Sequence, residues 1–392
     1  MIGGIPMTTF KVLGVIAATI LCCSIWFLRA NSDADCVENV VRPIAEIATG
    51  KGGRPLLVPV DWDGSRYSFL LDTGAARTVF DTSLRSQLGA VREVQSGDTS
   101  AGQIALECFD CPPAKVGGLD LQVLDQISCA DLSRLRQTTG KEIHGIVGID
   151  FLKNYAIEIR FDDGTVSFFA APPKNWGNAR AISLQLVRGV PHVTANFAGV
   201  EEAVIVDTGA NASYLSAKVF DGLVAANQLR LCAKAKTLTL AGGLNSSQGY
   251  VSSVRIGALE RGASRFSRDS FTGLGLQSLS RFIVRIDFPG AVAYFAPGRT
   301  FGEPDSMATS GAAVLEIGGQ KTIISTEPGG AADVAGLSAG DVVTRIDGRL
   351  AESMDMHEVG ELLTSEVNRE IEVQFRRYGV IQSTAMVLKS RF

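Results

Sequence analysis

Histidine is scarce in this chain. Only His144, His192 and His357 occur among its 392 residues. A Ser-His-Asp enzyme also needs a nucleophile segment of the Gly-x-Ser-Gly-Gly kind, and the sequence has none. The His-Glu-x-x-His pair that holds zinc in many peptidases is missing too. These absences argue against serine-protease chemistry and against the common metallopeptidase chemistry.

Cysteine is also sparse. Five of the seven cysteines follow residue 35, and two of these frame the C-x-x-C segment Cys108–Cys111. Such a segment can be half of a zinc site, a redox pair or a small disulfide. No second C-x-x-C and no histidine pair completes a zinc site, and no thioredoxin-like βαβ pattern surrounds the motif. A structural disulfide or a pair of free thiols remains.

The chain has no excess of positive charge. Its formal net charge is −4, whereas domains that bind nucleic acid carry basic patches. No low-complexity tract or long run of like charges is present. We therefore expect no nucleic-acid partner. The 42 glycines favour a β-rich fold with many turns.

One long apolar run stands near the amino terminus. Val12–Leu28 is uncharged over 17 residues, with Lys11 before it and Arg29 after it. This length is at the lower limit for a membrane span and slightly long for a signal-peptide core. We expect residues 1–35 to be an uncleaved membrane anchor; a removed signal peptide and a buried core helix are the alternatives. Either targeting segment places the rest of the chain outside the cytoplasm, in the periplasm if the cell is Gram-negative.

The tetrapeptide Asp-Thr-Gly-Ala occurs twice, at Asp72–Ala75 and Asp207–Ala210. Each copy follows an apolar strand-like run, residues 69–71 and 204–206. A buried strand that ends in Asp-Thr-Gly delivers a carboxylate at a tight turn, where glycine permits close backbone approach. Two such turns face to face would place two carboxylates around one water as a general acid/base pair.

The surroundings of the two copies repeat as well. Each copy has a predicted hairpin before it, and each has an apolar-apolar-Gly element after it, at residues 147–152 and 274–279. The strands that follow, 156–161 and 283–288, also align. The aspartates are 135 residues apart and the glycines 127, as expected of a duplicated unit with a shorter second loop. The sequence thus predicts a mainly β fold built from two similar lobes.

This arrangement resembles the aspartic peptidases of the retropepsin and pepsin type, joined in one chain. The resemblance implies a two-lobed β-barrel fold, with lobes at residues 46–173 and 174–300, that hydrolyses protein or peptide substrates without a metal or an organic cofactor. It implies that the catalytic pair is complete within one chain. The alternative is a catalytically inactive peptide-binding or adaptor protein of the cell envelope with the same fold. The implied catalytic residues are Asp72 and Asp207, supported by Thr73, Gly74, Thr208 and Gly209.

Two further features follow from the resemblance. Both turns end in alanine, Ala75 and Ala210, where pepsin-like enzymes have a hydroxyl residue that donates to the carboxylate. Its absence predicts an activity optimum at weakly acidic or neutral pH. Flexible hairpins usually cover such a pair of carboxylates, and small-residue turns at Gly102 and at Gly242-Gly243 are the candidates. Ordinary hairpin loops are the alternative for both.

The last part of the chain is similar to a bacterial PDZ domain, expected at residues 310–392 after a linker at 302–309. The segment Ala335-Gly336-Leu337 leads through Gly340-Asp341 into a strand and an Asp-Gly turn. A helix is expected at 354–363 and closing strands at 370–376 and 383–388. PDZ domains bind the carboxy-terminal ends of peptides beside an edge strand, although a purely scaffolding role is the alternative. The residues implied in the peptide groove are Gly311, Ala312, Ala313, Val314 and Leu315.

Overall fold

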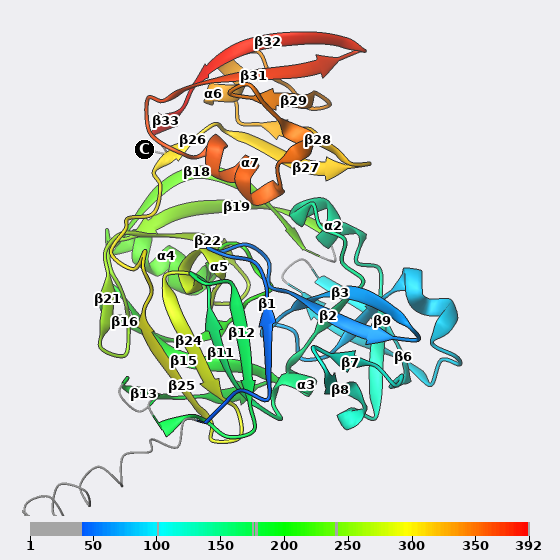
Figure 1. Ribbon diagram of the computed structural model, residues 1–392. Helices are drawn as coiled ribbons and strands as arrows, with labels where there is room; N and C mark the ends of the chain where they lie inside the picture. The colour runs from blue at the N-terminus through cyan, green and yellow to red at the C-terminus, as the bar shows by residue number, and fades with distance from the viewer. Residues whose placement is uncertain (1–40, 100–101, 175, 177–178, 240–241, 391–392) are drawn as a thin grey trace, which may run out of the picture. The chain divides into compact units, whose positions relative to one another are not determined.

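The computed structural model describes residues 41–99, 102–174, 176, 179–239 and 242–390. The expected membrane anchor at residues 1–35 lies outside the described residues and stays a prediction. No helix among the described residues is long and apolar enough to cross a membrane. The described chain is mainly β, with short helices, as the sequence predicted (Figure 1).

The first large sheet contains the first Asp-Thr-Gly copy. In β2 the side chains alternate between buried and partly exposed, whereas the end of β3 is buried on both faces. The predicted hairpin turns at Asp63-Gly64, where both residues have positive φ. Its nine strands are β2 (Leu57–Trp62), β3 (Ser65–Leu71), β4 (Val79–Asp81), β5 (Glu93–Thr99), β6 (Gly102–Asp110), β7 (Lys115–Val116), β8 (Leu119–Asp120), β9 (Gln126–Ala130) and β10 (Gly145–Val147).

The second large sheet contains the second copy. The predicted hairpin before Asp207 is present as β15 and β16, which turn at Ala198-Gly199. Its strands are β14 (Gln185–Val187), β15 (Val190–Phe197), β16 (Val200–Val206), β17 (Tyr214–Ser216), β18 (Leu229–Thr239), β19 (Gly242–Val251), β20 (Val254–Ile256), β21 (Leu259–Arg261), β22 (Ser264–Asp269) and β23 (Gly273–Leu274).

The two sheets have the same strand order. The first runs β5-β6-β9-β4-β10-β3-β2-β7-β8 and the second β18-β19-β22-β17-β23-β16-β15-β20-β21, so each of the nine strands of the first sheet has a counterpart in the second, which also has β14 paired with β15. In both, the strand before the aspartate pairs in parallel with the strand of the apolar-apolar-Gly element. This one-to-one match confirms the duplication expected from the sequence. We call the two sheets, with the helices attached to them, the first and second lobe.

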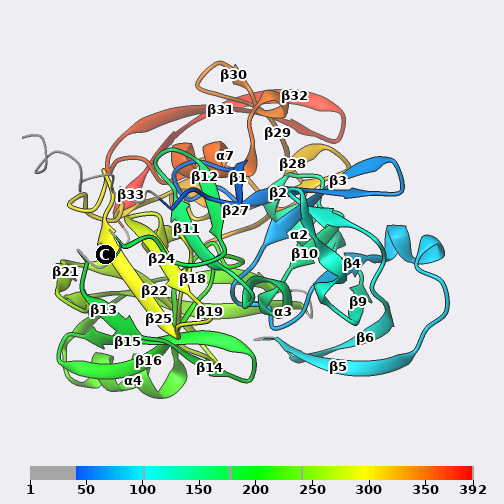
Figure 2. The ribbon, with the colours of Figure 1, turned by 60° about the horizontal axis from the view of Figure 1, so that its bottom comes forward.

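A six-stranded sheet joins the lobes between them (Figure 2). At its centre β11 and β24 pair antiparallel, and Glu158 lies directly opposite Arg285. Arg285 Nε donates to Glu158 Oε2 at 2.5 Å. The strand order is β1 (Ala45–Ala48), β12 (Thr165–Phe169), β11 (Ala156–Arg160), β24 (Phe282–Asp287), β25 (Val292–Pro297) and β13 (Ala181–Ser183).

Short helices connect the strands of both lobes. Each apolar-apolar-Gly element continues into a one-turn helix that packs against an Asp-Thr-Gly turn. The α-helices of the lobes are α2 (Ser133–Thr139), α3 (Ile149–Leu152), α4 (Ala217–Ala225) and α5 (Leu276–Leu279), and short 3₁₀ turns lie at Thr82–Gln87 and Leu121–Val123.

The carboxy-terminal sheet has a hydrophobic core of its own, which includes Ile323, Ile346 and Phe375. Its helix α7 begins at a capping box, in which Asp355 accepts from the Glu358 amide at 2.9 Å while Glu358 accepts from the Asp355 amide. The elements are β27 (Ala312–Ile317), β28 (Gln320–Thr326), α6 (Ala331–Val334), β29 (Val342–Ile346), β30 (Arg349–Leu350), a 3₁₀ turn at Ala351–Ser353, α7 (Met356–Leu363), β31 (Glu370–Arg377) and β32 (Val380–Val387), and a separate two-stranded pair joins β26 (Ala308–Thr309) to β33 (Lys389–Ser390).

The expected linker at residues 302–309 is fastened to the second lobe. Asp305 is almost fully buried and lies 3.3 Å from the guanidinium of Arg261, which is buried too. Its carboxylate also accepts from the Arg265 amide and from the Gln277 side chain, both at 3.0 Å. The linker segment therefore follows a fixed path, because a buried charge pair is stable only when both partners are held in place.

The C-x-x-C segment carries free thiols. Cys108 is buried and Cys111 partly buried, and neither forms a disulfide. Burial, helped by nearby carboxylates, raises the pKa of Cys111 to about 12. A thiol held in its neutral form is a poor nucleophile and a poor metal ligand. Of the two alternatives left by the sequence, free thiols are correct and the disulfide is not.

Candidate active site

The two aspartates lie at the ends of equivalent buried strands. Asp72 follows β3, and its amide donates to the carbonyl of Val147 at 3.0 Å. Asp207 follows β16, and its amide donates to the carbonyl of Leu274, also at 3.0 Å. Since β10 and β23 pair in parallel with these strands, each amide hydrogen bond ties its aspartate to the neighbouring strand.

The two turns are bound to each other by their threonines. The Thr73 amide donates to Thr208 Oγ1, and the Thr208 amide donates to Thr73 Oγ1, both at 3.0 Å. Each hydroxyl in turn donates to a carbonyl of the opposite lobe, Thr73 to Val206 at 2.5 Å and Thr208 to Leu71 at 2.8 Å. Both threonines are fully buried. The reciprocal bonds join residues far apart in the sequence into one site.

The carboxylates are held by the backbone of their own turns. Asp72 Oδ1 accepts from the amides of Gly74 and Ala75 at 2.7 and 3.1 Å. Asp207 Oδ1 accepts from the amides two and three residues on, at 3.0 and 3.1 Å. A Cβ on Gly74 would overlap the carboxylate of Asp207, and a Cβ on Gly209 would overlap that of Asp72. The glycines thus leave room for the two carboxylates to approach each other.

A hydroxyl residue six positions after each aspartate braces the turn from behind. Thr78 Oγ1 donates to Asp150 at 2.7 Å and accepts from the Gly148 amide at 3.2 Å. In the second lobe Ser213 Oγ accepts from the Gly275 amide at 3.1 Å. No motif in the sequence pointed to the role of Asp150. The second lobe has Gln277 in place of this aspartate, so the repeat gave no signal for it.

The electrostatics of the pair oppose double ionisation. Burial, and next to it the charge of Asp207, raises the pKa of Asp72 to about 7, although the turn amides oppose this. Burial also raises the pKa of Asp207. Two carboxyl groups in one enclosed site cannot both ionise at low cost, so they share a proton over a wide pH range.

This shift predicts how stability depends on pH. Because folding raises the pKa of Asp72 from about 3.8 to about 7, the folded chain binds more protons than the unfolded chain between these values. The stability that the protonated Asp72 carboxyl contributes to the folded chain is full below about pH 4 and is lost as the pH rises to about 7. Urea unfolding at several pH values should therefore show a steeper decline for wild type than for Asp72→Asn. Equal slopes in the two proteins would contradict the shift.

One residue of the site was missed by the sequence reasoning. The hydroxyl of Tyr214 donates to Asp207 Oδ2 at 2.6 Å. Ala75 and Ala210 leave the turns without a hydroxyl donor, but Asp207 receives one from Tyr214, and the expected pH optimum stays a prediction. Tyr214, in the strand after the turn, thus supplies the hydroxyl donor that Ala210 cannot supply.

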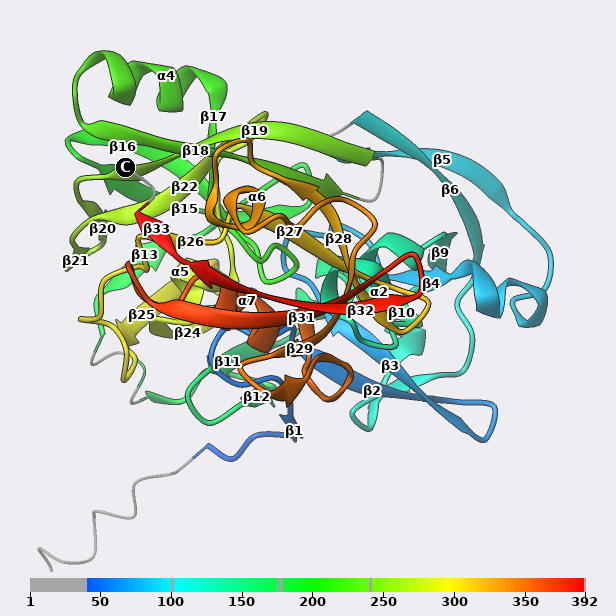
Figure 3. The same cartoon turned by 90° about the horizontal axis from the view of Figure 1, so that it is seen from above.

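The two candidate flaps are hairpins. Gly102 begins β6 and pairs with Thr99 across the β5–β6 hairpin. Gly242 begins β19, and Gly242 and Gly243 pair with the last residues of β18. In Figures 2 and 3 the described strands of the two hairpins extend toward each other. The turn residues 100–101 and 240–241 lie outside the described residues, so a flap role stays a prediction.

The predicted peptide groove of the carboxy-terminal sheet lies beside helix α2 of the first lobe. β27, which holds four of the five predicted groove residues, is an edge strand next to α7. Helix α2 of the first lobe packs against both β27 and α7 (Figure 1). At the end of α2, a Cβ on Gly140 would lie 2.9 Å from Glu316 Oε2 and from Met356 Cγ.

The loop before β27 also has internal partners. The Gly311 amide donates to Thr309 Oγ1 at 3.1 Å, and the Ala312 amide donates to Ser310 Oγ at 3.2 Å. Ala313, Val314 and Leu315 continue as β27, paired with β28. A carboxylate ligand would have to compete for the two amides, and peptide binding at this groove stays a prediction.

Two ion pairs link this sheet to the first half of the chain. Asp355, at the start of α7, accepts from Arg54 Nε at 3.0 Å. Lys141 Nζ lies 3.5 Å from the same carboxylate. Together with the buried Asp305, these contacts hold the carboxy-terminal sheet against the lobes.

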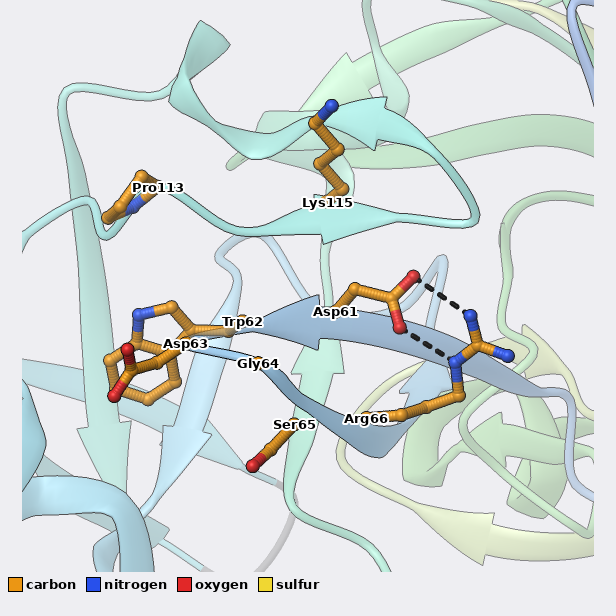
Figure 4. Close-up of a pocket in the computed structure, with 8 residues that line it drawn as sticks. All are labelled: Asp61, Trp62, Asp63, Gly64, Ser65, Arg66, Pro113 and Lys115. Carbon is orange, nitrogen blue, oxygen red and sulfur yellow. Dashed lines mark hydrogen bonds and ion pairs between the residues drawn. The ribbon is translucent and has the colours of Figure 1, made fainter.

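A separate surface hollow of about 460 Å³ opens at the β2–β3 hairpin, at the opposite end of β3 from Asp72 (Figure 4). Asp61 and Arg66 form a two-bonded ion pair there, at 2.7 and 3.1 Å. The hollow contains none of the predicted site residues, and its Asp61 and Arg66 already satisfy each other.

Comparisons with known proteins match parts of this chain. A curated relative, the chloroplastic C-terminal processing peptidase of Tetradesmus obliquus, is 30% identical over 69 residues, which are 18% of this chain and 15% of the relative. A solved structure, the photosystem II D1 C-terminal processing protease, has 22% identity and a TM-score of 0.21, over 22% of this chain and 25% of that chain. This chain thus spans only a small part of either protein. Two family models match more specifically, and by them residues 58–151 are an aspartyl protease domain and residues 322–377 a PDZ domain.

Proposed function

We propose that this chain is an aspartic endopeptidase whose catalytic pair is Asp72 and Asp207. One observation carries the proposal: the reciprocal Thr73–Thr208 hydrogen bonds bring two equivalent Asp-Thr-Gly turns into one site. The match to the aspartyl protease family includes Asp72. Asp207 lies outside the matched residues, and its role is supported by the equivalent strands and hydrogen bonds of the second lobe.

The chemistry follows from the shared proton. The ionised carboxylate takes a proton from a water molecule as this water attacks the scissile carbonyl carbon, while the protonated carboxyl donates to the carbonyl oxygen. The resulting neutral gem-diol collapses when its amide nitrogen receives the proton that the first carboxylate took from the water, while the second carboxylate takes back a hydroxyl proton, and the C–N bond breaks. Thr73 and Thr208 keep the turns in register, and Gly74 and Gly209 give the carboxylates space. The β5–β6 and β18–β19 hairpins are proposed to cover the substrate.

The PDZ domain is proposed to bind substrate or partner peptides beside β27. Its buried and ion-paired attachment supports a fixed position next to the first lobe. The short matches to processing peptidases add no argument about mechanism. An extracytoplasmic, membrane-anchored or secreted location stays a prediction from residues 1–35.

The test is hydrolysis of a peptide library by the full chain at a series of enzyme concentrations. Since both aspartates come from one chain, activity per mole of enzyme should stay constant on dilution into the nanomolar range. A steep loss on dilution, reversed by concentrating the sample, would show that the two turns act in different subunits. Peptide binding without any cleavage would instead support the inactive adaptor.

A further inference from the structure

The two lobes differ at one pair of opposed positions beside the aspartates. In the first lobe Val79 of β4 lies opposite Ile146 of β10. In the second lobe the equivalent residues are Tyr214 of β17 and Gly273 of β23. A Cβ at residue 273 would lie 2.7 Å from Tyr214 Cε2, well inside contact distance. The phenol ring of Tyr214 therefore fills the space that is left free because Gly273 has no side chain.

This exchange gives the two carboxylates different partners. Asp207 accepts from the Tyr214 hydroxyl on Oδ2 and from two turn amides on Oδ1. Asp72 accepts from two turn amides on Oδ1, and the Gly209 amide of the opposite turn also lowers its pKa, but among the described residues no side chain donates to it. A hydrogen bond from a neutral donor favours the charged form of a carboxylate. The Tyr214 hydroxyl, which has no counterpart on Asp72, thus makes the charge more stable on Asp207 than on Asp72.

We propose that Tyr214 is a positioning residue that keeps the negative charge of the pair on Asp207 and the shared proton on Asp72. The proposal rests on the proposed peptidase function and assigns the general base and the general acid within it. Asp207 takes the proton from the attacking water, and Asp72 donates its proton to the carbonyl oxygen of the scissile bond.

One charged group near Tyr214 opposes this assignment, and the others are paired. Strands β17 and β23 carry no charged residue. From β22 the charge of Asp269 raises the pKa of both Tyr214 and Asp207, although the Tyr214 hydrogen bond acts on Asp207 more strongly. Arg268 is bound to Asp221 at 2.9 and 2.8 Å, and Arg265 donates to Gln277. From the first lobe, Asp72 faces the same phenol. Burial, followed by the charge of Asp207, raises the pKa of Tyr214 well above its ordinary value. The phenol therefore stays a donor wherever the pair holds one proton.

Carboxyl titration of the full chain by ¹³C NMR tests the proposal without relying on turnover. The Asp72 and Asp207 signals are assigned by their loss in Asp72→Asn and Asp207→Asn. In wild type Asp207 should lose its proton first as the pH rises. In Tyr214→Phe, which keeps the ring, this first pKa should rise by about one unit and the two carboxyls should share the charge more evenly. An unchanged titration would overturn the proposal.

The matched control is Tyr155→Phe. Tyr155 packs against Phe151 and Phe168, and its change should leave both carboxyl titrations as in wild type. In the pH profile of kcat/KM, Tyr214→Phe should move the acid limb about one pH unit toward neutral, whereas Tyr155→Phe should not move it. A shifted NMR titration in a protein that cleaves no peptide would uphold the role of Tyr214 and reject the peptidase function. If cleavage requires Asp72 and Asp207 but the acid limb does not move in Tyr214→Phe, the peptidase function is upheld and the role of Tyr214 is rejected.

Discussion

Replacing either Asp72 or Asp207 by asparagine is expected to lower kcat/KM for peptide hydrolysis by at least about a hundredfold. The amide can still accept from the turn amides, so the local geometry should persist. What is lost is a group that exchanges a proton, and one remaining carboxyl cannot act as base and acid in the same step. Steady-state kinetics on a fluorogenic peptide measure the loss, and circular dichroism checks the fold.

The control for this prediction is Asp63→Asn, the same chemical change at an exposed turn. Asp63 has a φ of 48° in the β2–β3 hairpin, a conformation that asparagine adopts readily. This variant should keep wild-type kinetics. Near-normal turnover in either Asp72→Asn or Asp207→Asn would mean that the aspartic mechanism is wrong.

The second large effect is expected for Thr208→Val, which keeps the shape of the side chain and removes its hydroxyl. The Thr73 amide then loses its acceptor and the Leu71 carbonyl loses its donor, and both lie in the buried contact between the lobes. At about 1–3 kcal/mol for each of the two buried groups left without a partner, the lobes should lose about 2–6 kcal/mol of stability. Activity should fall too, because the carboxylates lose their fixed separation.

Thr208→Ser is the matched control, because it retains the hydroxyl and removes one methyl group. Its loss should stay under about 1.5 kcal/mol. Denaturation followed by tryptophan fluorescence isolates the effect, since Trp62 and Trp176 lie before residue 310 and the PDZ domain has no tryptophan. Equal stability of the valine and serine variants would show that the hydroxyl bonds contribute nothing to joining the lobes.

The sequence predicted the repeated parts of this molecule well. Asp72 and Asp207 stand in matching apolar contexts, so the strands, turns and threonines predicted around one aspartate were also predicted around the other. The PDZ elements were predicted because small residues and turns mark them, for example Gly336 and Gly340. In both cases the residues that allowed the prediction lie close together in the sequence.

Features that depend on contacts between distant segments were not predicted. Asp305 stands in a stretch with the composition of a linker, and only the tertiary fold brings Arg261 to it. Tyr214 reads as an ordinary strand residue, and its role depends on the absence of a side chain at Gly273, 59 residues later. The packing of α2 against the PDZ domain likewise has no counterpart in any motif.

The ion pair at the centre of the shared sheet has a consequence for how such a chain can assemble. Glu158 and Arg285 are equivalent residues of the two lobes and lie opposite each other where β11 meets β24. Two copies of the first lobe joined in the same way would oppose Glu158 with Glu158, and two copies of the second would oppose arginine with arginine. Like charges directly across a strand pair destabilise it. The two halves are thus selective for each other, and a molecule cut between them would reassemble as a heterodimer in preference to either homodimer.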